Sequence, residues 1–311
     1  MVQAAIDIGT VTTRLIIGEI NNGKVDIYDY RTIITDLGEG LTKSGIISDA
    51  AYGRLLAALK EFREAIASRQ AELSATGGGD TILLKAVATS AMRDAANAPE
   101  ILAALEEEGF TLEIISGSRE AELSFKGTLS GFDAFTGPVM SIDVGGGSTE
   151  LILGTGSAEH LLSHSFDIGS RRVTEMFCAS DPPGSEQLQE MRAWVAHETR
   201  DFVTSLPLKP TEIIAVAGTA TSAITMRDNI TVYDRNQVHG KYLSAAELDE
   251  LISKLATLTL EERRQVPGLH PGRAPVIVGG LIILEVLLEL LGKERLLVSD
   301  TDILQGIILD N

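Results

Sequence analysis

Short apolar runs separated by polar turns open the chain. Val2–Ile8 is mainly apolar, Gly9–Thr13 interrupts the run, and Leu15–Ile17 resumes it. This pattern predicts two strands joined by a tight turn. Asn21–Gly23 is a strong hairpin signal, and the β-branched and aromatic residues of Val25–Ile34 predict a third strand.

A longer amphipathic segment follows these strands. Within Asp49–Arg69, apolar side chains recur every three or four residues, at Leu55, Leu59, Phe62 and Ile66. This spacing predicts a helix that packs one face against a sheet. The rest of this half is predicted to contain the strand Thr81–Ala88, a short helix after Ser90, the helix Pro99–Glu108 and the strand Leu112–Ile115. Such an arrangement indicates helices that cover a mixed sheet.

The opening pattern recurs in the second half of the chain. Val139–Asp143 is an apolar run that ends in an acid, Gly145–Ser148 is a turn, and Leu151–Leu153 and His160–Asp167 predict two more strands. Both halves therefore begin with a strand, an Asp-x-Gly turn and a second strand. A repeat at so long an interval indicates a duplicated domain rather than a solenoid.

Helices predominate in the remainder of the second half. Ile213–Ala217 predicts a strand that runs into Gly218–Thr221, while Val276–Leu291 predicts a buried helix because glycines and glutamates interrupt its apolar run. Ser244 and Thr259 each precede a glutamate by three residues, which predicts a capping box at the start of a helix. Further predicted elements are a helix at 185–205, a strand at 295–298 and a helix at 301–309.

Length, charge and cysteine content narrow the class of protein. The chain has 311 residues, which suggests about two domains, and no apolar run reaches the ~18 residues that span a membrane. The net charge of −18 disfavours nucleic-acid binding, which needs a basic face. The single cysteine, Cys178, cannot form an internal disulfide. We therefore expect a cytoplasmic protein with neither a membrane nor a nucleic acid as partner.

The second Asp-x-Gly loop carries the stronger chemical signal. Asp143 is followed by Gly145, Gly146 and Gly147, and then by the hydroxyl of Ser148. Three consecutive glycines leave the backbone N–H groups bare, so that they can bind phosphate oxygens as an anion nest. A plain hairpin turn is the alternative, although an Asn-Gly pair would serve a hairpin better.

The first loop repeats part of this chemistry. Asp7, Gly9, Thr10 and Thr12 supply an acid, a glycine and two hydroxyls. Asp7 and Asp143 end equivalent strands, so we expect them to face each other across a cleft between the halves. Phosphate chains arrive with Mg²⁺, which binds carboxylate oxygens directly or through water. The two acids are therefore candidate ligands for Mg²⁺, with Mn²⁺ as the alternative metal.

Three further elements carry candidate binding or catalytic residues. Gly218 and Thr219 lie between a strand and a helix, where either an anion site or a plain tight turn is expected. Glu120 begins a helix near the junction of the halves, either as a general base or as a partner for the helix dipole. Arg14 and Arg93 follow loops or strand ends, where most arginines are solvated, but guanidinium groups near phosphate loops in an acidic chain favour phosphate binding.

On these residues the chain resembles the exopolyphosphatase / guanosine pentaphosphate phosphohydrolase (Ppx/GppA) family, in its short two-domain form. The matching segments lie in the family's order, at 5–10, 88–94, 115–121, 142–150, 217–221 and 269–274. The resemblance implies an α/β fold of two duplicated actin-like (acetate/sugar kinase–Hsp70–actin), ribonuclease H-like domains with a cleft between them. We expect residues 1–117 and 299–311 to form the first domain and 118–298 the second.

The same resemblance implies Mg²⁺-dependent hydrolysis of the terminal phosphoanhydride of inorganic polyphosphate, with release of orthophosphate. It implies that Glu120 is the catalytic glutamate, that Glu150 is a further functional acid and that Arg93 contacts phosphate. The phosphate-binding residues expected from the loops are Gly9, Thr10, Thr12, Arg14, Gly145, Gly146, Gly147, Ser148, Gly218 and Thr219.

Val11 departs from the family's first loop, which commonly reads Asp-x-Gly-Ser/Thr-Asn-Ser. Thr10-Val11-Thr12 lacks the amide donor of that asparagine, which bears on the preferred length of the phosphate chain. A guanosine pentaphosphate (pppGpp) phosphohydrolase, a non-catalytic polyphosphate or alarmone sensor and an actin-like ATPase stay as alternatives. The oligomeric state is open, with a homodimer as one option.

Overall fold

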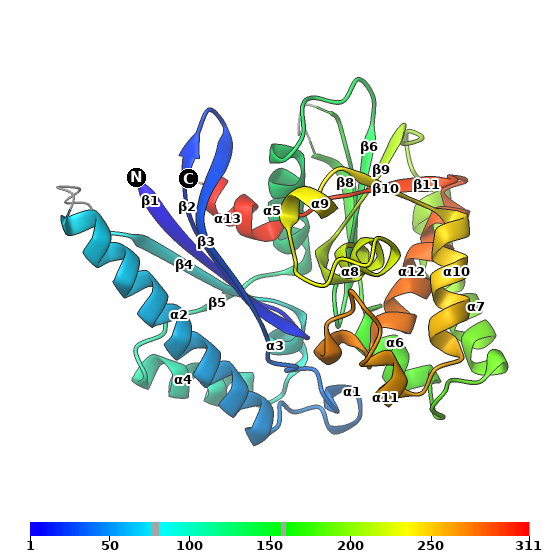
Figure 1. Cartoon of the computed structure of the whole chain (residues 1–311), viewed down its shortest axis with the longest axis horizontal. Helices are drawn as coiled ribbons and strands as arrows, with labels where there is room; N and C mark the ends of the chain where they lie inside the picture. Colours follow the sequence, from blue (N-terminus) through cyan, green and yellow to red (C-terminus); the bar gives the residue numbers. More distant parts are fainter. Residues whose placement is uncertain (76–80, 157–159, 311) are drawn as a thin grey trace.

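Two mixed β-sheets flanked by helices organise the chain (Figure 1). The computed structural model describes residues 1–75, 81–156 and 160–310. The first sheet contains β1 (Val2–Ile8), β2 (Thr12–Asn21), β3 (Lys24–Ile34), β4 (Leu83–Ala88) and β5 (Glu113–Ile114), in the order β3-β2-β1-β4-β5. The strands β1, β2 and β3 are antiparallel, whereas β4 and β5 continue the sheet parallel to β1.

The second sheet repeats this order. It contains β6 (Val139–Val144), β7 (Thr149–Gly154), β8 (His160–Phe166), β9 (Glu212–Val216), β10 (Lys241–Ser244) and β11 (Arg295–Val298), in the order β10-β11-β9-β6-β7-β8. Here β6, β7 and β8 form the antiparallel part, and β9 and β11 continue it in parallel. The short β10 is added antiparallel at the edge. This shared topology confirms the predicted duplication of two α/β domains of the actin-like, ribonuclease H-like kind.

One face of the first sheet is covered by α2 (Asp49–Ala75) and α4 (Ala98–Glu107). The predicted stripe is buried on α2, because Leu55, Leu59 and Phe62 are all inaccessible to solvent. The helix continues to Ala75, beyond its predicted end, since the residues after Arg69 include neither glycine nor proline.

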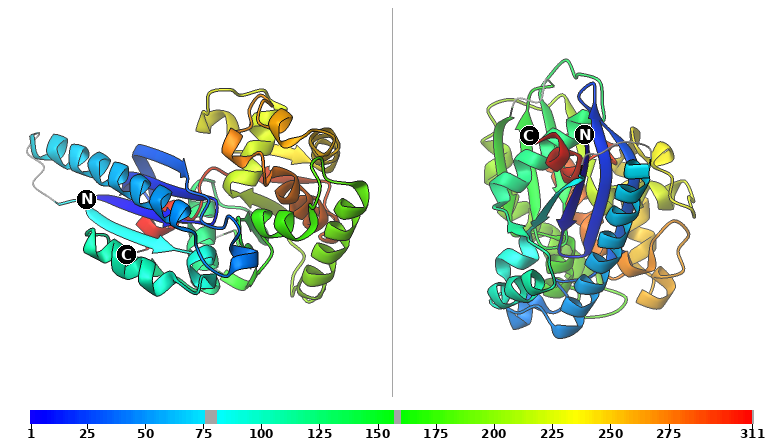
Figure 2. Two further views of the ribbon diagram at one scale, coloured as in Figure 1. Left: turned by 90° about the horizontal axis from the view of Figure 1, so that it is seen from below. Right: turned by 90° about the vertical axis from the view of Figure 1, so that its left-hand side faces the viewer.

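The opposite face of the first sheet receives the C-terminal helix. Figures 1 and 2 show α13 (Ile303–Leu309), in red, against the blue strands of the first domain, with α5 (Gly117–Ser130) beside it. The two helix backbones touch, because a Cβ added at Gly127 would lie 1.7 Å from the carbonyl oxygen of Asp302. Through Phe125, α5 also packs against the second sheet. The domain boundaries at 117, 118, 298 and 299 stay a prediction.

The predicted buried helix forms the centre of the second domain. It is α12 (Ile277–Leu290), and it contacts α6 (Ser170–Phe177), α7 (Ser185–Thr204), α8 (Ala217–Arg227) and α10 (Ala245–Ala256). Both predicted capping boxes are confirmed, at Ser244 before α10 and at Thr259 before α11 (Leu260–Arg263).

Several short elements were not predicted from the sequence. These are α1 (Leu41–Ser44), α6, α9 (Arg235–Val238) and β10. Elements of four to eight residues are too short to show a clear hydrophobic period. The predicted short helix after Ser90 is α3 (Ser90–Asp94).

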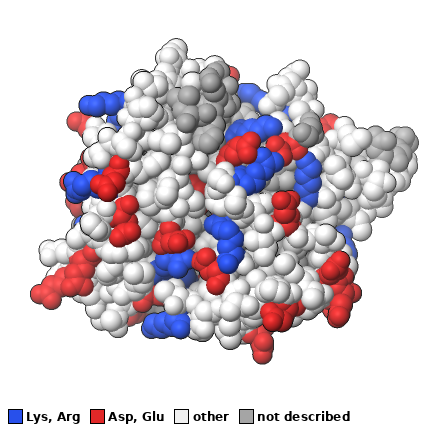
Figure 3. Space-filling view, turned by 180° about the vertical axis from the view of Figure 1, so that it is seen from behind, with Lys and Arg blue, Asp and Glu red and all other residues white. Residues whose placement is uncertain are grey.

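The helices and the charged side chains at the surface fit the expectations drawn from the apolar runs and the net charge of the sequence. Among the helices of the described ranges, none has the length and apolar character to cross a bilayer. On the face shown in Figure 3, acidic and basic side chains are interspersed, without a broad basic surface.

Candidate active site

The two Asp-x-Gly loops face each other across a narrow cleft between the domains. The cleft has a volume of about 60 Å³. It brings together most of the residues predicted from the sequence, namely Asp7, Gly9, Thr10, Thr12, Arg14, Glu120, Asp143, Gly145, Gly146, Gly147, Ser148, Gly218 and Thr219. Two predicted residues, Arg93 and Glu150, do not line it.

The second loop presents its N–H groups to this cleft. The N–H of Gly145 closes the turn on the carbonyl of Ser148 at 3.0 Å. The carbonyls of Gly145 and Gly146 accept hydrogen bonds from N–H groups at the start of α6. Because each peptide is planar and trans, a carbonyl held toward α6 turns the next N–H the other way. The N–H groups that follow these carbonyls are therefore free to bind an anion.

The first loop has the same backbone arrangement. The N–H of Gly9 donates to the carbonyl of Thr12 at 2.9 Å, which matches the turn of the second loop. The carbonyl of Thr10 accepts from Gly38, and the carbonyl of Val11 accepts from Thr35 and Asp36. Here the segment that follows β3, rather than a helix, holds the carbonyls away from the cleft.

Asp7 is paired with an arginine. Arg14 lies opposite Asp7 in the β1–β2 register, and its Nη2 is 2.6 Å from Asp7 Oδ2. The other end of the guanidinium forms an ion pair with Asp302, the N-cap residue of α13. Burial raises the pKa of Asp7, although Arg14 opposes this shift. Arg14 is thus already shared by two carboxylates.

Asp143 has no such partner. The hydroxyl of Ser124, on α5, donates to Asp143 Oδ2 at 2.7 Å, and no described arginine forms an ion pair with this carboxylate. Burial raises the pKa of Asp143 to about 6, partly offset by the Ser124 hydrogen bond. A buried carboxylate without a compensating cation is suited to bind one.

Glu120 enters the cleft from the first turn of α5. The N-cap residue Ser116 fixes this helix start by accepting a hydrogen bond from the N–H of Arg119. The residue is 9% exposed, and Arg93 Nη1 lies 2.6 Å from its Oε2. Burial raises the pKa of Glu120 to about 7, against the attraction of Arg93. A carboxylate with a pKa near neutrality has the property required of a general base.

Arg93 and Glu150 lie behind the carboxylates that line the cleft. Arg93 lines a separate pocket of about 390 Å³, together with Ser165, and its Nη1 donates to the Ile115 carbonyl and to Glu120 at the edge of the cleft. Glu150 is 1% exposed and accepts a hydrogen bond from Ser165 at 2.6 Å. Burial, followed by the charges of Glu120 and Asp143, raises the pKa of Glu150 well above its usual value.

The strand-to-helix turn between β9 and α8 closes another side of the cleft. Its first residue, Ala217, has a left-handed φ of 64°. A Cβ at Gly218 would lie 1.7 Å from Arg273 Nη1, so only glycine fits beneath this guanidinium. In the described residues no acid pairs with Arg273, and burial lowers its pKa to about 10. Arg273 is therefore an uncompensated cation beside the loops, which sequence reasoning missed.

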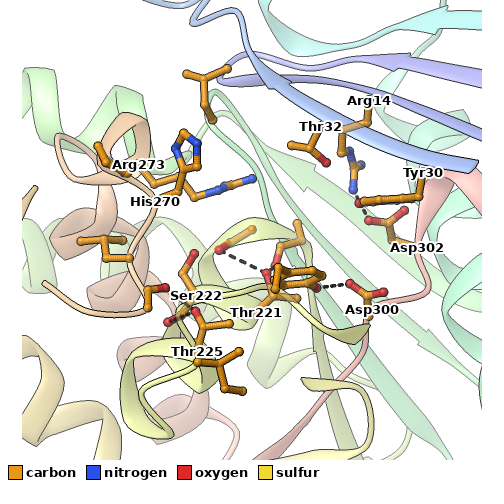
Figure 4. Close-up of a pocket in the computed structure, with 18 of the residues that line it drawn as sticks. Arg14, Tyr30, Thr32, Thr221, Ser222, Thr225, His270, Arg273, Asp300 and Asp302 are labelled. Atoms are coloured by element: carbon orange, nitrogen blue, oxygen red, sulfur yellow. Dashed lines mark hydrogen bonds and ion pairs between the residues drawn. The ribbon is translucent and has the colours of Figure 1, made fainter. Parts of the chain in front are cut away.

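A larger pocket of about 440 Å³ adjoins the cleft (Figure 4). Both cavities share Arg14 and Arg273 at their boundary. Tyr30 from β3 and Tyr233 from the loop before α9 line this pocket, and the hydroxyl of Tyr233 donates to Asp300. The pocket also carries several threonine and serine hydroxyls, so its lining is mixed aromatic and polar.

The chemistry of the cleft fits a divalent cation that is completed by substrate. The described residues contain no cluster of three or more His, Cys, Asp or Glu side chains arranged to hold a metal. Mg²⁺, however, commonly binds one or two carboxylates together with water and phosphate oxygens. Asp7 Oδ1 is buried without a hydrogen-bond partner among the described residues, and Asp143 lacks an arginine. These two acids therefore suit Mg²⁺ bound together with a phosphate chain.

Comparison with known proteins gives consistent results along the chain. Residues 16–311 match the model of the Ppx/GppA phosphatase family. Exopolyphosphatase 2 of Mycobacterium tuberculosis is 34% identical, over 98% of this chain and 97% of that protein.

Solved structures of similar proteins also match the chain over its whole length. An exopolyphosphatase from Cytophaga hutchinsonii superimposes with a TM-score of 0.89 at 26% identity, covering all of this chain and 98% of the other. The Aquifex aeolicus PPX-GPPA enzyme superimposes with a TM-score of 0.81 at 29% identity, covering all of this chain and 99% of the other.

Proposed function

The chain belongs to the Ppx/GppA phosphatase family, and on that premise we propose that it is an exopolyphosphatase. It hydrolyses the terminal phosphoanhydride of inorganic polyphosphate and releases orthophosphate. The observation that carries this proposal is the opposition of two N–H-presenting loops in one cleft with Glu120 beside them. The names of the similar proteins support the same substrate.

The loops bind the phosphates of the substrate. The terminal phosphate accepts hydrogen bonds from the N–H groups of Gly146, Gly147 and Ser148, and the first loop binds the adjoining phosphate through Thr10 and Thr12. Gly218 and Thr219 supply a further anchor, and the unpaired guanidinium of Arg273 neutralises part of the charge. Phosphoryl transfer depends mainly on such positioning and electrostatic stabilisation.

Glu120 removes a proton from the attacking water. Arg93 acts by holding the Glu120 carboxylate in place, since it pairs with that carboxylate and does not itself line the cleft among the described residues. Glu150 lies behind the site, where burial and the charges of Glu120 and Asp143 raise its own pKa well above the usual value. The water oxygen bonds to the terminal phosphorus on the side opposite the bridging oxygen, and the bond from that phosphorus to the bridging oxygen breaks. The shortened chain leaves with the bridging oxygen, and the terminal phosphate is released as orthophosphate.

Asp143 and Asp7 would hold the divalent cation, Mg²⁺ or Mn²⁺. When bound, this cation neutralises charge on the phosphate oxygens as the bond to the leaving group breaks. Asp143 is the principal ligand, because Asp7 is shared with Arg14.

The general-base role of Glu120 is tested with Glu120→Gln. This isosteric change removes the base, which is typically worth 10²–10⁴-fold, so we expect turnover to fall by roughly 10²-fold or more with the fold intact. Phosphate release from polyphosphate with Mg²⁺ measures the effect, and the thermal transition checks the fold. Full activity in this variant would overturn the assignment.

A second candidate substrate is pppGpp, favoured by the pocket of about 440 Å³ that adjoins the cleft. Its two tyrosines offer faces for a base, and both substrates end in a phosphoanhydride. Phosphate release from short polyphosphate, long polyphosphate, pppGpp and ATP separates the candidates. Tyr233→Ala should raise KM for pppGpp and leave KM for polyphosphate unchanged. Release from ATP alone would instead indicate an actin-like ATPase, and release from none of them a sensor.

A further inference from the structure

Arg172 lies behind the second phosphate loop and contacts both domains. Its Nε donates to the carbonyl oxygen of Gly147 at 2.9 Å, and its Nη2 forms an ion pair with Asp94. Gly147 belongs to the loop after β6 in the second domain, whereas Asp94 ends α3 beside the first sheet. One side chain therefore joins the anion-binding loop to the opposite domain.

The carbonyl of Gly147 differs from its neighbours in how it is held. The carbonyls of Gly145 and Gly146 accept from backbone N–H groups of α6, which any sequence could supply, and the carbonyl of Gly145 also accepts from the Ser170 hydroxyl at 3.1 Å within the same domain. The carbonyl of Gly147 accepts from the side chain of Arg172. Because the peptide is planar, this contact also sets the direction of the N–H of Ser148, the last donor of the nest.

Asp94 provides the other end of this connection. It follows Arg93, which pairs with Glu120, so α3 touches the site at two neighbouring residues. The side chains of Arg172 and Asp94 are 21% and 31% exposed, so this ion pair is only partly screened by solvent. If the domains move apart, Asp94 leaves and the guanidinium gains rotational freedom.

We propose that Arg172 is a positioning residue that orients the Gly147–Ser148 peptide toward phosphate, and that Asp94 makes this orientation depend on closure of the cleft. The proposal rests on the proposed function only in taking phosphate as the ligand of the loop. Phosphate binding and closure are then linked reciprocally, since closure strengthens phosphate binding by the same factor by which bound phosphate favours closure. Opening of the cleft would loosen the loop and release orthophosphate.

The helix α6, which carries Arg172, also carries the residue for a matched control. Arg171 forms an ion pair with Asp36 of the first domain, but its side chain does not contact a loop carbonyl. Arg171→Met therefore removes a contact between the domains and leaves the Gly147 carbonyl held. Arg192→Met is a second control, because Arg192 pairs with Glu285 inside the second domain.

Orthophosphate affinity, measured by titration calorimetry, tests the proposal. We expect Arg172→Met to weaken binding on the order of tenfold, within the range typical of coupled sites, and more than Arg171→Met does. Arg192→Met should leave the affinity unchanged. An unchanged affinity in Arg172→Met, or an equal or larger loss in Arg171→Met, would overturn the positioning role.

A mutant cycle tests the link to the other domain. Asp94→Asn should weaken phosphate binding, and Arg172→Met combined with Asp94→Asn should be no weaker than Arg172→Met alone. Additive losses would show that the two residues act separately, against the proposal. Arg172→Lys should recover part of the affinity, because a single ammonium group can reach Gly147 or Asp94 but does not reproduce the fork of arginine.

Amide exchange separates this proposal from the proposed function. In phosphate-free protein, Arg172→Met should speed deuterium exchange at the Gly145 amide of the 145–148 segment, whose hydrogen bond to the Ser148 carbonyl closes the loop, while Arg192→Met should not. If the wild type releases no phosphate from polyphosphate but Arg172→Met speeds exchange and Arg192→Met does not, the proposed substrate fails and the positioning role stands. If polyphosphate is hydrolysed and exchange in the segment is the same in Arg172→Met, the positioning role fails alone.

Discussion

The two Asp-x-Gly loops share one backbone arrangement but differ in how their acids are compensated. Each loop closes on itself through one hydrogen bond, Gly9 to Thr12 in the first and Gly145 to Ser148 in the second. Asp7, however, is neutralised by Arg14, whereas Asp143 is held only by a hydroxyl. The duplication has kept the loop geometry while the two carboxylates have taken different environments.

The loops also differ in what supports them. The carbonyls of the first loop are held by the segment 35–38 of its own domain. Those of the second loop are held by backbone N–H groups of α6 and by the side chain of Arg172 on the same helix. A side chain that also contacts the other domain holds the second loop directly, whereas the first loop is linked to the other domain through Asp36, whose N–H holds Val11 and whose carboxylate pairs with Arg171. This difference predicts that changes in the second loop affect turnover more than equivalent changes in the first.

The largest effect should come from exchanging the two acids for amides. Asp143→Asn removes the uncompensated carboxylate, and we expect turnover to fall roughly 10²–10³-fold, as for the loss of one preorganised electrostatic group. The fold should persist, because no ion pair is broken. Activity assays at saturating Mg²⁺, with calorimetric Mg²⁺ titration, measure this change.

Asp7→Asn is the matched variant in the first loop. It removes one of the two ion pairs of Arg14 and leaves the pair with Asp302, so it should lower stability by less than the about 3–5 kcal/mol expected for a buried charge left without any partner. Chemical denaturation measures that cost. Equal losses of turnover and equal stability in Asp7→Asn and Asp143→Asn would show that the two acids are equivalent and would contradict the difference in their environments.

The second-largest loss of activity should come from adding a side chain at a glycine of the second loop. A Cβ at Gly147 would lie 2.3 Å from Ser90 Oγ and 2.9 Å from Thr10 Oγ1, both in the other domain. Gly147→Ala should therefore push the domains apart and lower kcat/KM about 10²-fold, since small misplacements of reacting groups are costly. Small-angle scattering should show a more open molecule.

Gly9→Ala provides the comparison for the first loop. Its Cβ would meet only the carbonyl of Thr12 in the same loop, at 3.0 Å, so the strain stays local. We expect a smaller loss of activity and no change in overall dimensions. A more open molecule in Gly9→Ala than in Gly147→Ala would contradict this account.

The third effect is the pH dependence of turnover, which both loops influence through Glu120. Its pKa of about 7 is raised by burial and by the charges of Asp143 and Asp7, and lowered by Arg93, while its own charge helps to raise the pKa of Glu150. A general base must be ionised, so activity should fall about tenfold per pH unit below that pKa. Removing the cation in Arg93→Met raises the pKa further and should shift this limb to higher pH. An unshifted limb would mean that another group is the base.

The smallest effect should come from Val11. Its side chain is 5% exposed and lies close to Gly146 of the opposite loop. Val11→Asn adds an amide donor to the first loop but loses this packing, so we expect KM for polyphosphate to change by less than about tenfold with kcat nearly constant. Comparing short and long chains shows whether this position affects chain-length preference. A large loss of kcat would indicate that Val11 matters for closure instead.

Much of the fold could be predicted because its signals are local. The apolar runs of β1 and β6, the glycines that follow them and the spacing of Leu55, Leu59 and Phe62 are patterns among neighbouring residues. The long apolar run of α12 and the capping boxes before α10 and α11 are equally local. These signals were sufficient for the duplicated α/β architecture and for most residues that line the cleft.

The tertiary structure alone decided which charges in the cleft are compensated. Arg14 pairs with Asp302 from the far end of the chain, Arg273 covers Gly218, and Ser124 holds Asp143. None of these pairs has a sequence pattern, because each depends on where helices such as α13 and α5 return to the sheets. The sequence by itself therefore determined the loops and their donors, whereas the return of distant segments determined the charge and pKa of each acid among them.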